Sequence, residues 1–375
     1  MLNYFDYAAT SPMSQRAVTS YVECAKAFPL NPSSIHRGGR EAHEELEKAR
    51  MKVSSILGIR PEQTIFTSGA TEAINIVFSS LLWQKSPGRV LISRIEHDAI
   101  KAFIPLLKDK GWDVVMLKAK KGFVDPEEVK ENLSPETRLV AVMAVNNVNG
   151  AIEPTNEISS VIREYEKTIK HKIVFFSDSV QALAKTTLEL EKSGVDAASF
   201  SAHKISGPRG VGMLYMRSRN LIRPLSSAGG QEMGMRGGTE NLAGIVSFAS
   251  VLEEAYEKRK EKEERVKALS EKMKREFESI GLQLNSEGNT SPYIINVSTP
   301  FPSEVFSRML DDKGFSVSSG SACSNNAKKG ENIIEAMGYG AKRAGSSVRI
   351  SLSDETEDIE VDNLITAIKE IASGK

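Results

Sequence analysis

Short apolar runs alternate with amphipathic segments between about residues 60 and 215, and this alternation constrains the fold more than any other feature. Apolar runs of this length are typical of buried strands, whereas the intervening segments, such as 99–110 and 156–170, have helical spacing. Strands that alternate with helices predict an α/β fold with a mostly parallel sheet covered by helices. The predicted strands are 64–67, 89–92, 114–117, 139–142 and 173–176.

The pattern changes after about residue 240, where the spacing predicts one long helix over 241–280. The charged run 257–265 is expected to be the solvated face of this helix. Its apolar positions recur mostly every three or four residues: Tyr256, Val266, Leu269, Met273, Phe277 and Ile280.

Beyond Gly281 the chain is predicted to form a smaller α+β unit with strands at 293–297 and 347–351. A domain boundary is therefore expected inside the long helix. We predict a large domain over 13–255 and a small domain over 1–12 and 256–375.

Composition narrows the class of protein. The 375 residues include 49 basic and 49 acidic side chains, a balance that argues against direct nucleic-acid binding or a membrane surface. Two cysteines, Cys24 and Cys323, are too few for a disulfide framework, which favours a reducing compartment. The sequence shows no basic leader and no apolar run of about 20 residues, so we expect a cytoplasmic protein.

The segment Ser201-Ala202-His203-Lys204 precedes a glycine-rich turn over 207–212. Lysine forms Schiff bases with carbonyl compounds, including pyridoxal phosphate (PLP), and the neighbouring serine and histidine could hydrogen-bond a phosphate. The alternative interpretation is a solvated lysine in a surface turn.

Two further segments follow predicted strands. The run 68–72 opens a helix, whose free N–H groups and threonine hydroxyl would form an anion site, or it is only a capped turn. Asp178 ends the strand 173–176 region, where a PLP enzyme would place the partner of the pyridine nitrogen; a helix cap is the alternative.

Three other side chains are candidates for chemistry. His97 could stack on a planar cofactor and move protons, or be a hydrogen-bonded loop histidine. Cys323 lies among small polar residues, which indicates an exposed nucleophile or an unreactive surface thiol, while Cys24 is the structural cysteine. Arg349 alternates with apolar residues and could hold a carboxylate, or lie on the surface.

Taken in order, these motifs resemble the cysteine desulfurases, which are fold type I PLP enzymes of the class V aminotransferase group. That resemblance covers essentially the whole chain and implies a mostly parallel seven-stranded sheet in the large domain. The motifs that carry it are Tyr4-Phe5-Asp6, Asn31-Pro32-Ser33-Ser34-Ile35-His36, Phe66 to Glu72, Glu96-His97, Asn146-Asn147, Asp178 to Gln181, Ser199 to Lys204, Gly229 to Glu232, Arg236 to Asn241, Ser319 to Cys323 and Arg349-Ile350-Ser351.

The resemblance implies roles for single residues. Lys204 would bind PLP covalently and move protons, Asp178 would pair with the pyridine nitrogen, Gln181 with the ring hydroxyl, and His97 would stack on the ring. The phosphate would lie among Ala70, Thr71, Ser201 and His203, with Thr239 reaching in from the second subunit of a homodimer.

It also implies a reaction. Asn147 and Arg349 would bind the substrate carboxylate, and Cys323 would take sulfur from L-cysteine as a persulfide, leaving alanine. The length of chain between Cys323 and Arg349 resembles the branch of the family that passes sulfur to iron–sulfur scaffold proteins or tRNA-thiolation enzymes. No metal is implied.

The chain departs from the family pattern after Asn147, where Val148-Asn149-Gly150 replaces the usual Glu-x-Gly, and at Ala184, which is commonly glycine. Other reactions on the same fold, a selenocysteine lyase or a cystine or cysteine lyase, remain alternatives. A non-catalytic sulfur-carrier scaffold is an alternative from another class.

Overall fold

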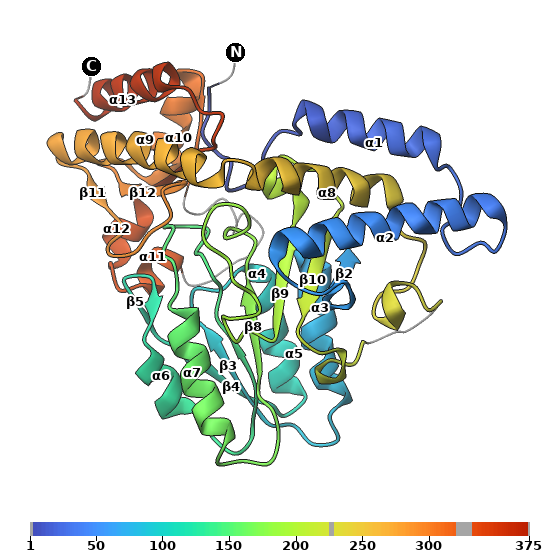
Figure 1. Cartoon of the computed structure of the whole chain (residues 1–375). Helices are drawn as coiled ribbons and strands as arrows, with labels where there is room; N and C mark the ends of the chain where they lie inside the picture. Colours follow the sequence, from blue (N-terminus) through green and yellow to red (C-terminus); the bar gives the residue numbers. More distant parts are fainter. Residues whose placement is uncertain (1–2, 225–228, 320–331, 374–375) are drawn as a thin grey trace.

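The computed structural model describes residues 3–224, 229–319 and 332–373. Its central element is a seven-stranded sheet of order β2-β10-β9-β8-β7-β3-β4, in which β10 alone runs antiparallel to its neighbours (Figure 1). The mostly parallel α/β sheet predicted from the alternation is confirmed, and each of the five predicted strands is present. The strands are β2 (Thr64–Thr67), β3 (Arg89–Ser93), β4 (Asp113–Leu117), β7 (Thr137–Ala141), β8 (Val174–Asp178), β9 (Ala197–Ser201) and β10 (Gly212–Met216).

Helices cover both faces of this sheet because its strands are apolar on both sides. Phe175 points to the face that packs with Leu46 and Phe248, whereas its neighbour Phe176 points to the face that packs with Ile74. The helices are α1 (Gln15–Ala27), α2 (Arg37–Leu57), α3 (Ala70–Ser79), α4 (Asp98–Lys101), α5 (Phe103–Asp109), α6 (Pro126–Asn132), α7 (Thr155–Glu166) and α8 (Leu242–Tyr256).

The prediction of one long helix over 241–280 is wrong, because the segment forms two helices, α8 and α9 (Arg259–Ser279). Lys258 adopts a left-handed conformation with φ of 54°, which ends the regular hydrogen bonding between the two. The two helices pack in different hydrophobic cores: α8 packs on the large sheet, whereas α9 packs in a second hydrophobic cluster. The helix predicted over 99–110 is likewise two short helices, α4 and α5.

The second cluster surrounds a four-stranded antiparallel sheet of order β11-β12-β15-β14. The N-terminal strand β1 (Asn3–Tyr4) pairs in parallel with β13 (Phe315–Ser316), and Phe5 packs in this same cluster. The remaining elements are β11 (Gln283–Leu284), β12 (Ile294–Ser298), β14 (Ser318–Ser319), β15 (Ser347–Ser351), α10 (Ser303–Asp312), α11 (Ile333–Ala336), α12 (Ala341–Gly345), α13 (Asp358–Ala372) and the short hairpin β5 (Ala119–Lys120) and β6 (Phe123–Val124). The predicted domain limits stay a prediction.

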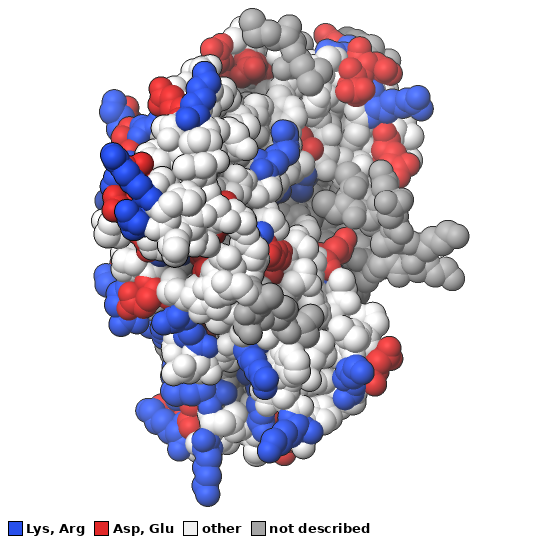
Figure 2. Space-filling model, turned by 90° about the vertical axis from the view of Figure 1, so that its right-hand side faces the viewer, with Lys and Arg blue, Asp and Glu red and all other residues white. Residues whose placement is uncertain are grey.

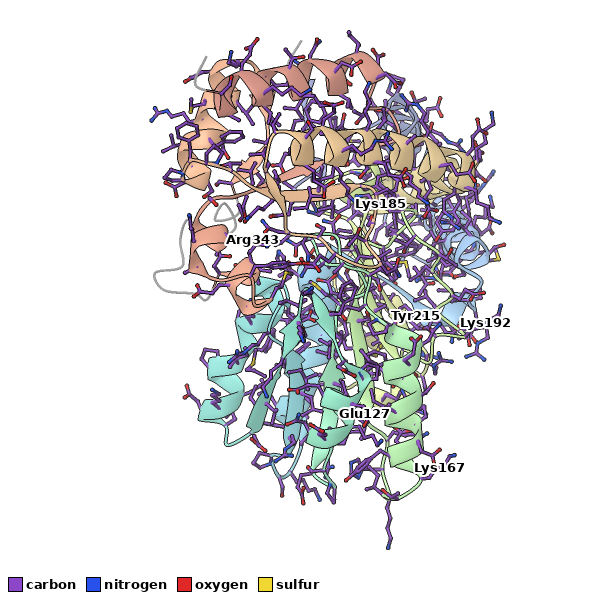
Figure 3. The ribbon with its side chains drawn as sticks, turned by 90° about the vertical axis from the view of Figure 1, so that its left-hand side faces the viewer. Glu127, Lys167, Lys185, Lys192, Tyr215 and Arg343 are labelled. Carbon is purple, nitrogen blue, oxygen red and sulfur yellow. The ribbon has the colours of Figure 1, made fainter. Side chains whose placement is uncertain are left out.

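Buried amides join the two units beside the segment that departs from the family pattern. Asn149 donates to the backbone oxygen of Asn285, and Asn296 donates to the backbone oxygen of Val148, both at 3.1 Å. Arg343, between the two units in Figure 3, donates to Asn285 at 2.8 Å. Val148 itself packs in the large core, so an apolar side chain fits where the family usually has glutamate. Among the described residues, no helix has the length and apolar character needed to cross a bilayer.

Candidate active site

The carboxyl ends of the parallel strands surround a cavity of about 310 Å³. Parallel sheets bind ligands at this edge, and the volume is in the range of small-molecule sites, roughly 300–1,000 Å³. Of the predicted site residues that the structure describes, the cavity brings together all except Thr239. Its lining includes Ala70, Thr71, His97, Asn147, Asp178, Gln181, Ser201, His203, Lys204 and Arg349.

One end of the cavity is the start of α3. The helix follows Gly69, which has φ of 151° and gives no side-chain cap, so first-turn N–H groups are available to an anion. Ser201 Oγ accepts from the Ala70 backbone N at 2.9 Å and thereby ties the end of β9 to this helix. A Cβ on Gly212 would lie 2.6 Å from Gly69 Cα, so the close approach of these segments requires glycine.

Lys204 lies one turn beyond β9, in the short 3₁₀ helix Ala202–Ile205. Its Nζ donates to the backbone oxygens of Ala8 at 2.7 Å and Ala9 at 2.6 Å. The lysine is therefore held across the cavity by a segment almost 200 residues away, and the surface-turn alternative does not hold.

Asp178 is the last residue of β8 and is buried. Its Oδ1 accepts from Val180 N at 3.1 Å and from Ser199 Oγ at 3.3 Å. Desolvation raises the pKa of Asp178, while the nearby His97 and Lys204 act in the opposite direction. A cationic group in the cavity would stabilise this carboxylate further.

Two histidines, His97 and His203, line the cavity and differ in their hydrogen-bond partners. His97 caps α4, since its Nδ1 accepts from Ala99 N at 3.1 Å, which fixes the ring at the cavity. Burial, with the charges of Lys204 and Arg209, lowers the pKa of His203 to about 4. His203 is thus neutral near pH 7, and its Nδ1 lies 3.0 Å from Thr10 Oγ1.

Gln181 is buried in the cavity wall and is bonded at both ends of its amide. Its Nε2 donates to the Ala8 backbone oxygen at 2.9 Å, and its Oε1 accepts from Lys185 Nζ at 3.3 Å. Lys185 lies between the sheet and the upper helices (Figure 3), and burial next to Lys204 lowers its pKa to about 7. Nothing in the sequence Ala184-Lys185-Thr186 distinguishes it from a surface lysine.

Arg349 comes from the central part of β15 and reaches the same cavity. Its Nη2 donates to Asp6 Oδ1 at 2.7 Å, and its Nη1 donates to the Asn147 backbone oxygen at 3.0 Å. The surface alternative for Arg349 is wrong, since the residue is only 4% exposed. Asp6 lies in the motif Tyr4-Phe5-Asp6, but no role was predicted for it.

Thr239 is exposed and lies outside the cavity of its own chain. Cys323 lies outside the described residues. The other cysteine, Cys24, is buried on α1, and burial raises its pKa to about 11, as expected for a structural thiol.

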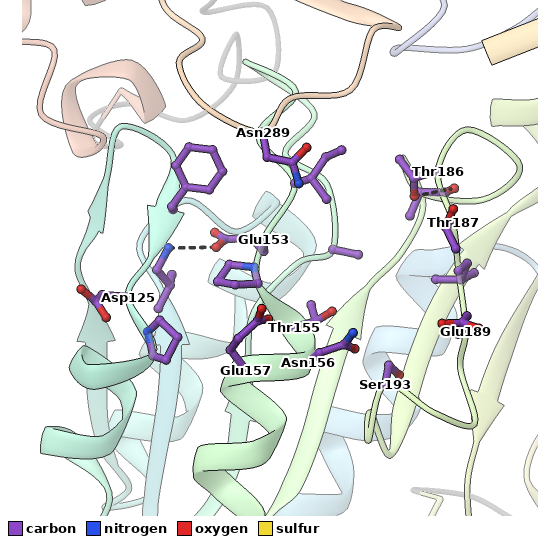
Figure 4. Close-up of a pocket in the computed structure, with 18 of the residues that line it drawn as sticks. Asp125, Glu153, Thr155, Asn156, Glu157, Thr186, Thr187, Glu189, Ser193 and Asn289 are labelled. Atoms are coloured by element: carbon purple, nitrogen blue, oxygen red, sulfur yellow. Dashed lines mark hydrogen bonds between the residues drawn. The ribbon is translucent and has the colours of Figure 1, made fainter. Parts of the chain in front are cut away.

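A second, larger cavity of about 750 Å³ lies beside the start of α7 (Figure 4). Its most buried charged side chain is Glu153, whose Oε2 accepts from Val124 N at 2.8 Å. Burial raises the pKa of Glu153 to about 8. Lys120 also lines this larger cavity, but the predicted site residues line the smaller one.

The smaller cavity fits PLP. An open helix start with Thr71, Ser201 and a neutral His203 suits a phosphate, and a buried carboxyl opposite suits a protonated ring nitrogen. Lys204 lines the same cavity and would bind the cofactor aldehyde.

The aminotransferase class-V family model matches residues 3–364. The chain belongs to the class-V aminotransferase family. Cysteine desulfurase IscS of Dictyoglomus turgidum is 34% identical over 98% of this chain and 94% of its own, and putative cysteine desulfurase IscS 1 of Bacillus subtilis is 34% identical over 98% and 97%. Among solved structures, a NifS-like protein matches with a TM-score of 0.92 at 33% identity over the full length of both chains.

Proposed function

We propose that this class-V enzyme is a PLP-dependent cysteine desulfurase, which converts L-cysteine to L-alanine and transfers the sulfur as a persulfide on Cys323. The arrangement that carries the proposal is the cavity in which Lys204, Asp178 and Arg349 converge. The relatives named cysteine desulfurase cover nearly the whole chain.

PLP would be held by the residues that the cavity brings together. Thr71, Ser201 and His203 would bind the phosphate, Asp178 the ring nitrogen, and His97 one face of the ring. When bound, PLP supplies an electron-withdrawing ring that stabilises negative charge at the substrate Cα. Gln181 would reach the ring hydroxyl with the amide hydrogen that does not bond Ala8.

The protein's own residues orient the substrate and move its protons. Arg349 and Asn147 would bind the α-carboxylate, because a guanidinium pairs well with that group. Lys204 Nζ would take the proton from Cα and return it, since two carbonyl oxygens hold its nitrogen at the cavity.

Cys323 would complete the reaction. Ser318 of β14 lies opposite Arg349 of β15, and Cys323 follows Ser318 by five positions. In the transfer, the Cβ–S bond of the substrate breaks, an S–S bond to the Cys323 thiolate forms, and the substrate Cβ takes a proton. An external thiol then reduces the persulfide and releases sulfide.

We also propose that the enzyme is a homodimer. The proposal is supported by two exposed apolar side chains in the loop that joins α1 to α2: Ile35 is 92% and Leu30 47% exposed. Figure 2 shows this side of the molecule, with uncharged surface between the charged side chains. Thr239 would then act in the partner's cavity, in keeping with its exposure in its own chain.

The sulfur acceptor would be a protein, such as an iron–sulfur scaffold or a tRNA-thiolation enzyme, in the cytoplasm. This proposal is supported by the relatives named IscS and by the spacing between Cys323 and Arg349.

The test is to incubate the purified holoenzyme with L-cysteine and dithiothreitol and to measure alanine, sulfide and pyruvate together. We expect equal amounts of alanine and sulfide. Pyruvate and ammonia in place of alanine would instead identify a lyase, and protein without a visible cofactor band would favour a scaffold.

A further inference from the structure

Asp6 forms an ion pair with Arg349, which lines the cavity. Its Oδ1 accepts from Arg349 Nη2 at 2.7 Å, and the two side chains are 22% and 5% exposed. Asp6 does not line the cavity, whereas the following residues Ala8 and Ala9 do. The aspartate therefore acts on any ligand through the arginine.

The backbone holds Asp6 firmly in this place. Asp6 forms a parallel bridge with Ser351, and Ser351 N donates to the Phe5 oxygen at 2.8 Å. On the other side, the Tyr4 hydroxyl donates to the Asp6 backbone oxygen at 3.0 Å. The carboxylate is therefore presented to Arg349 by a segment with little freedom.

Two acceptors from distant segments fix the plane of the guanidinium: Asp6 binds Nη2 and the Asn147 backbone oxygen binds Nη1. Within the described ranges, Arg349 Nε is buried and has no hydrogen-bond partner. A buried donor without a partner is unfavourable, so a carboxylate that approached this edge of the guanidinium would satisfy an unmet bond.

We propose that Asp6 is a positioning residue for substrate recognition, which holds Arg349 in the orientation that selects amino acids by their α-carboxylate. The inference rests on the proposed function for the identity of the substrate. Without Asp6, Arg349 would be a buried cation with a single carbonyl acceptor, free to rotate away from the carboxylate position.

The experiment compares two ligands that differ only at the carboxyl group. L-Alanine and L-alaninamide are titrated into the holoenzyme, and their dissociation constants are read from the cofactor absorbance. For Asp6→Ala we expect alanine to bind roughly tenfold to a hundredfold more weakly. Alaninamide binding should change less than about twofold, because it has no carboxylate to place.

The controls separate positioning from general damage. Asp113→Ala removes a more exposed aspartate–arginine pair, Arg89–Asp113 at 2.6 Å, at the opposite ends of the strands, and should change the binding of neither ligand. Asp6→Asn keeps the side-chain shape and should weaken alanine binding less than Asp6→Ala does. If Asp6→Ala does not retain the cofactor, Asp6→Asn is used for the test instead. Equal losses for both ligands, or tighter alanine binding, would overturn the proposal.

Turnover gives a second measurement. Asp6→Ala should raise KM for L-cysteine while kcat stays within about threefold, since the aspartate does not reach the reacting atoms. The absorbance titration involves no sulfur, so it still tests Asp6 if the enzyme proves not to be a desulfurase.

Discussion

Ser201 Oγ accepts a 2.9 Å hydrogen bond from the backbone N of Ala70, which joins the end of β9 to the first turn of α3. This bond fixes the position of Ser201 next to the start of α3, where the phosphate of PLP would bind. Ser201→Ala should weaken PLP binding by roughly tenfold to a hundredfold, because hydrogen bonds to charged groups contribute about 1.5–3 kcal/mol. Cofactor release during dialysis measures the effect. Ser160→Ala, on the exposed side of α7, is the control, and equal retention by both variants would exclude this role.

Lys185 is buried close to the half-buried Lys204, but only Lys204 lines the cofactor cavity, while Lys185 Nζ donates to Gln181 Oε1. Borohydride reduction of the holoenzyme should therefore attach the cofactor to the peptide that contains Lys204. Lys204→Ala should give no attachment, and Lys185→Met should keep it. Mass spectrometry of the digested protein identifies the site, and attachment at Lys185 would contradict the assignment.

Arg50 and Glu232 form a buried bidentate ion pair, in which Nη1 lies 2.7 Å from Oε2 and Nη2 lies 2.8 Å from Oε1. Their side chains are 4% and 1% exposed, and Glu232 also accepts from Phe66 N. Glu232→Gln should destabilise the protein by about 3–5 kcal/mol, because it deprives a buried cation of its buried carboxylate partner. Glu47→Gln removes the exposed partner of the same arginine and should cost less than about 1 kcal/mol. Chemical denaturation compares them, and equal effects would be inconsistent with this account.

We predict that the free energy of unfolding depends on pH through Glu153. Burial raises its pKa from 4.5 to about 8, so the folded state binds a proton that the unfolded state releases between these values. Its contribution to stability is complete below pH 4.5 and is lost as pH rises toward 8, by at most about 1.4 kcal/mol per pH unit. Glu153→Gln should remove this loss. The free energy of unfolding of wild type should fall relative to that of the variant between pH 5 and 8. Glu157→Gln, an exposed neighbour in Figure 4, should follow wild type.

The large sheet was predictable because its signals are local. Five of its seven strands contain a short apolar run, whereas β9 and β10 were not predicted from such a run. The residues at or just after the ends of β2, β8 and β9 become part of the cavity lining. The break at Lys258 was not predictable, because its left-handed conformation follows from two separate cores that α8 and α9 must reach.

The site was predictable where a motif carries the chemistry, as at Lys204 and Asp178. Its supporting contacts were not, because they join distant segments: Asp6 with Arg349, and Ala8 with both Lys204 and Gln181. Lys185 shows the limit most clearly, since only burial distinguishes it from a surface lysine.

The reaction assignment depends on Cys323, and the most direct test compares wild type with Cys323→Ala, both loaded with PLP. Alanine formed from L-cysteine is measured in the presence of dithiothreitol. We predict that the variant keeps the visible cofactor band and forms no alanine. Alanine output equal to that of wild type would contradict the persulfide mechanism.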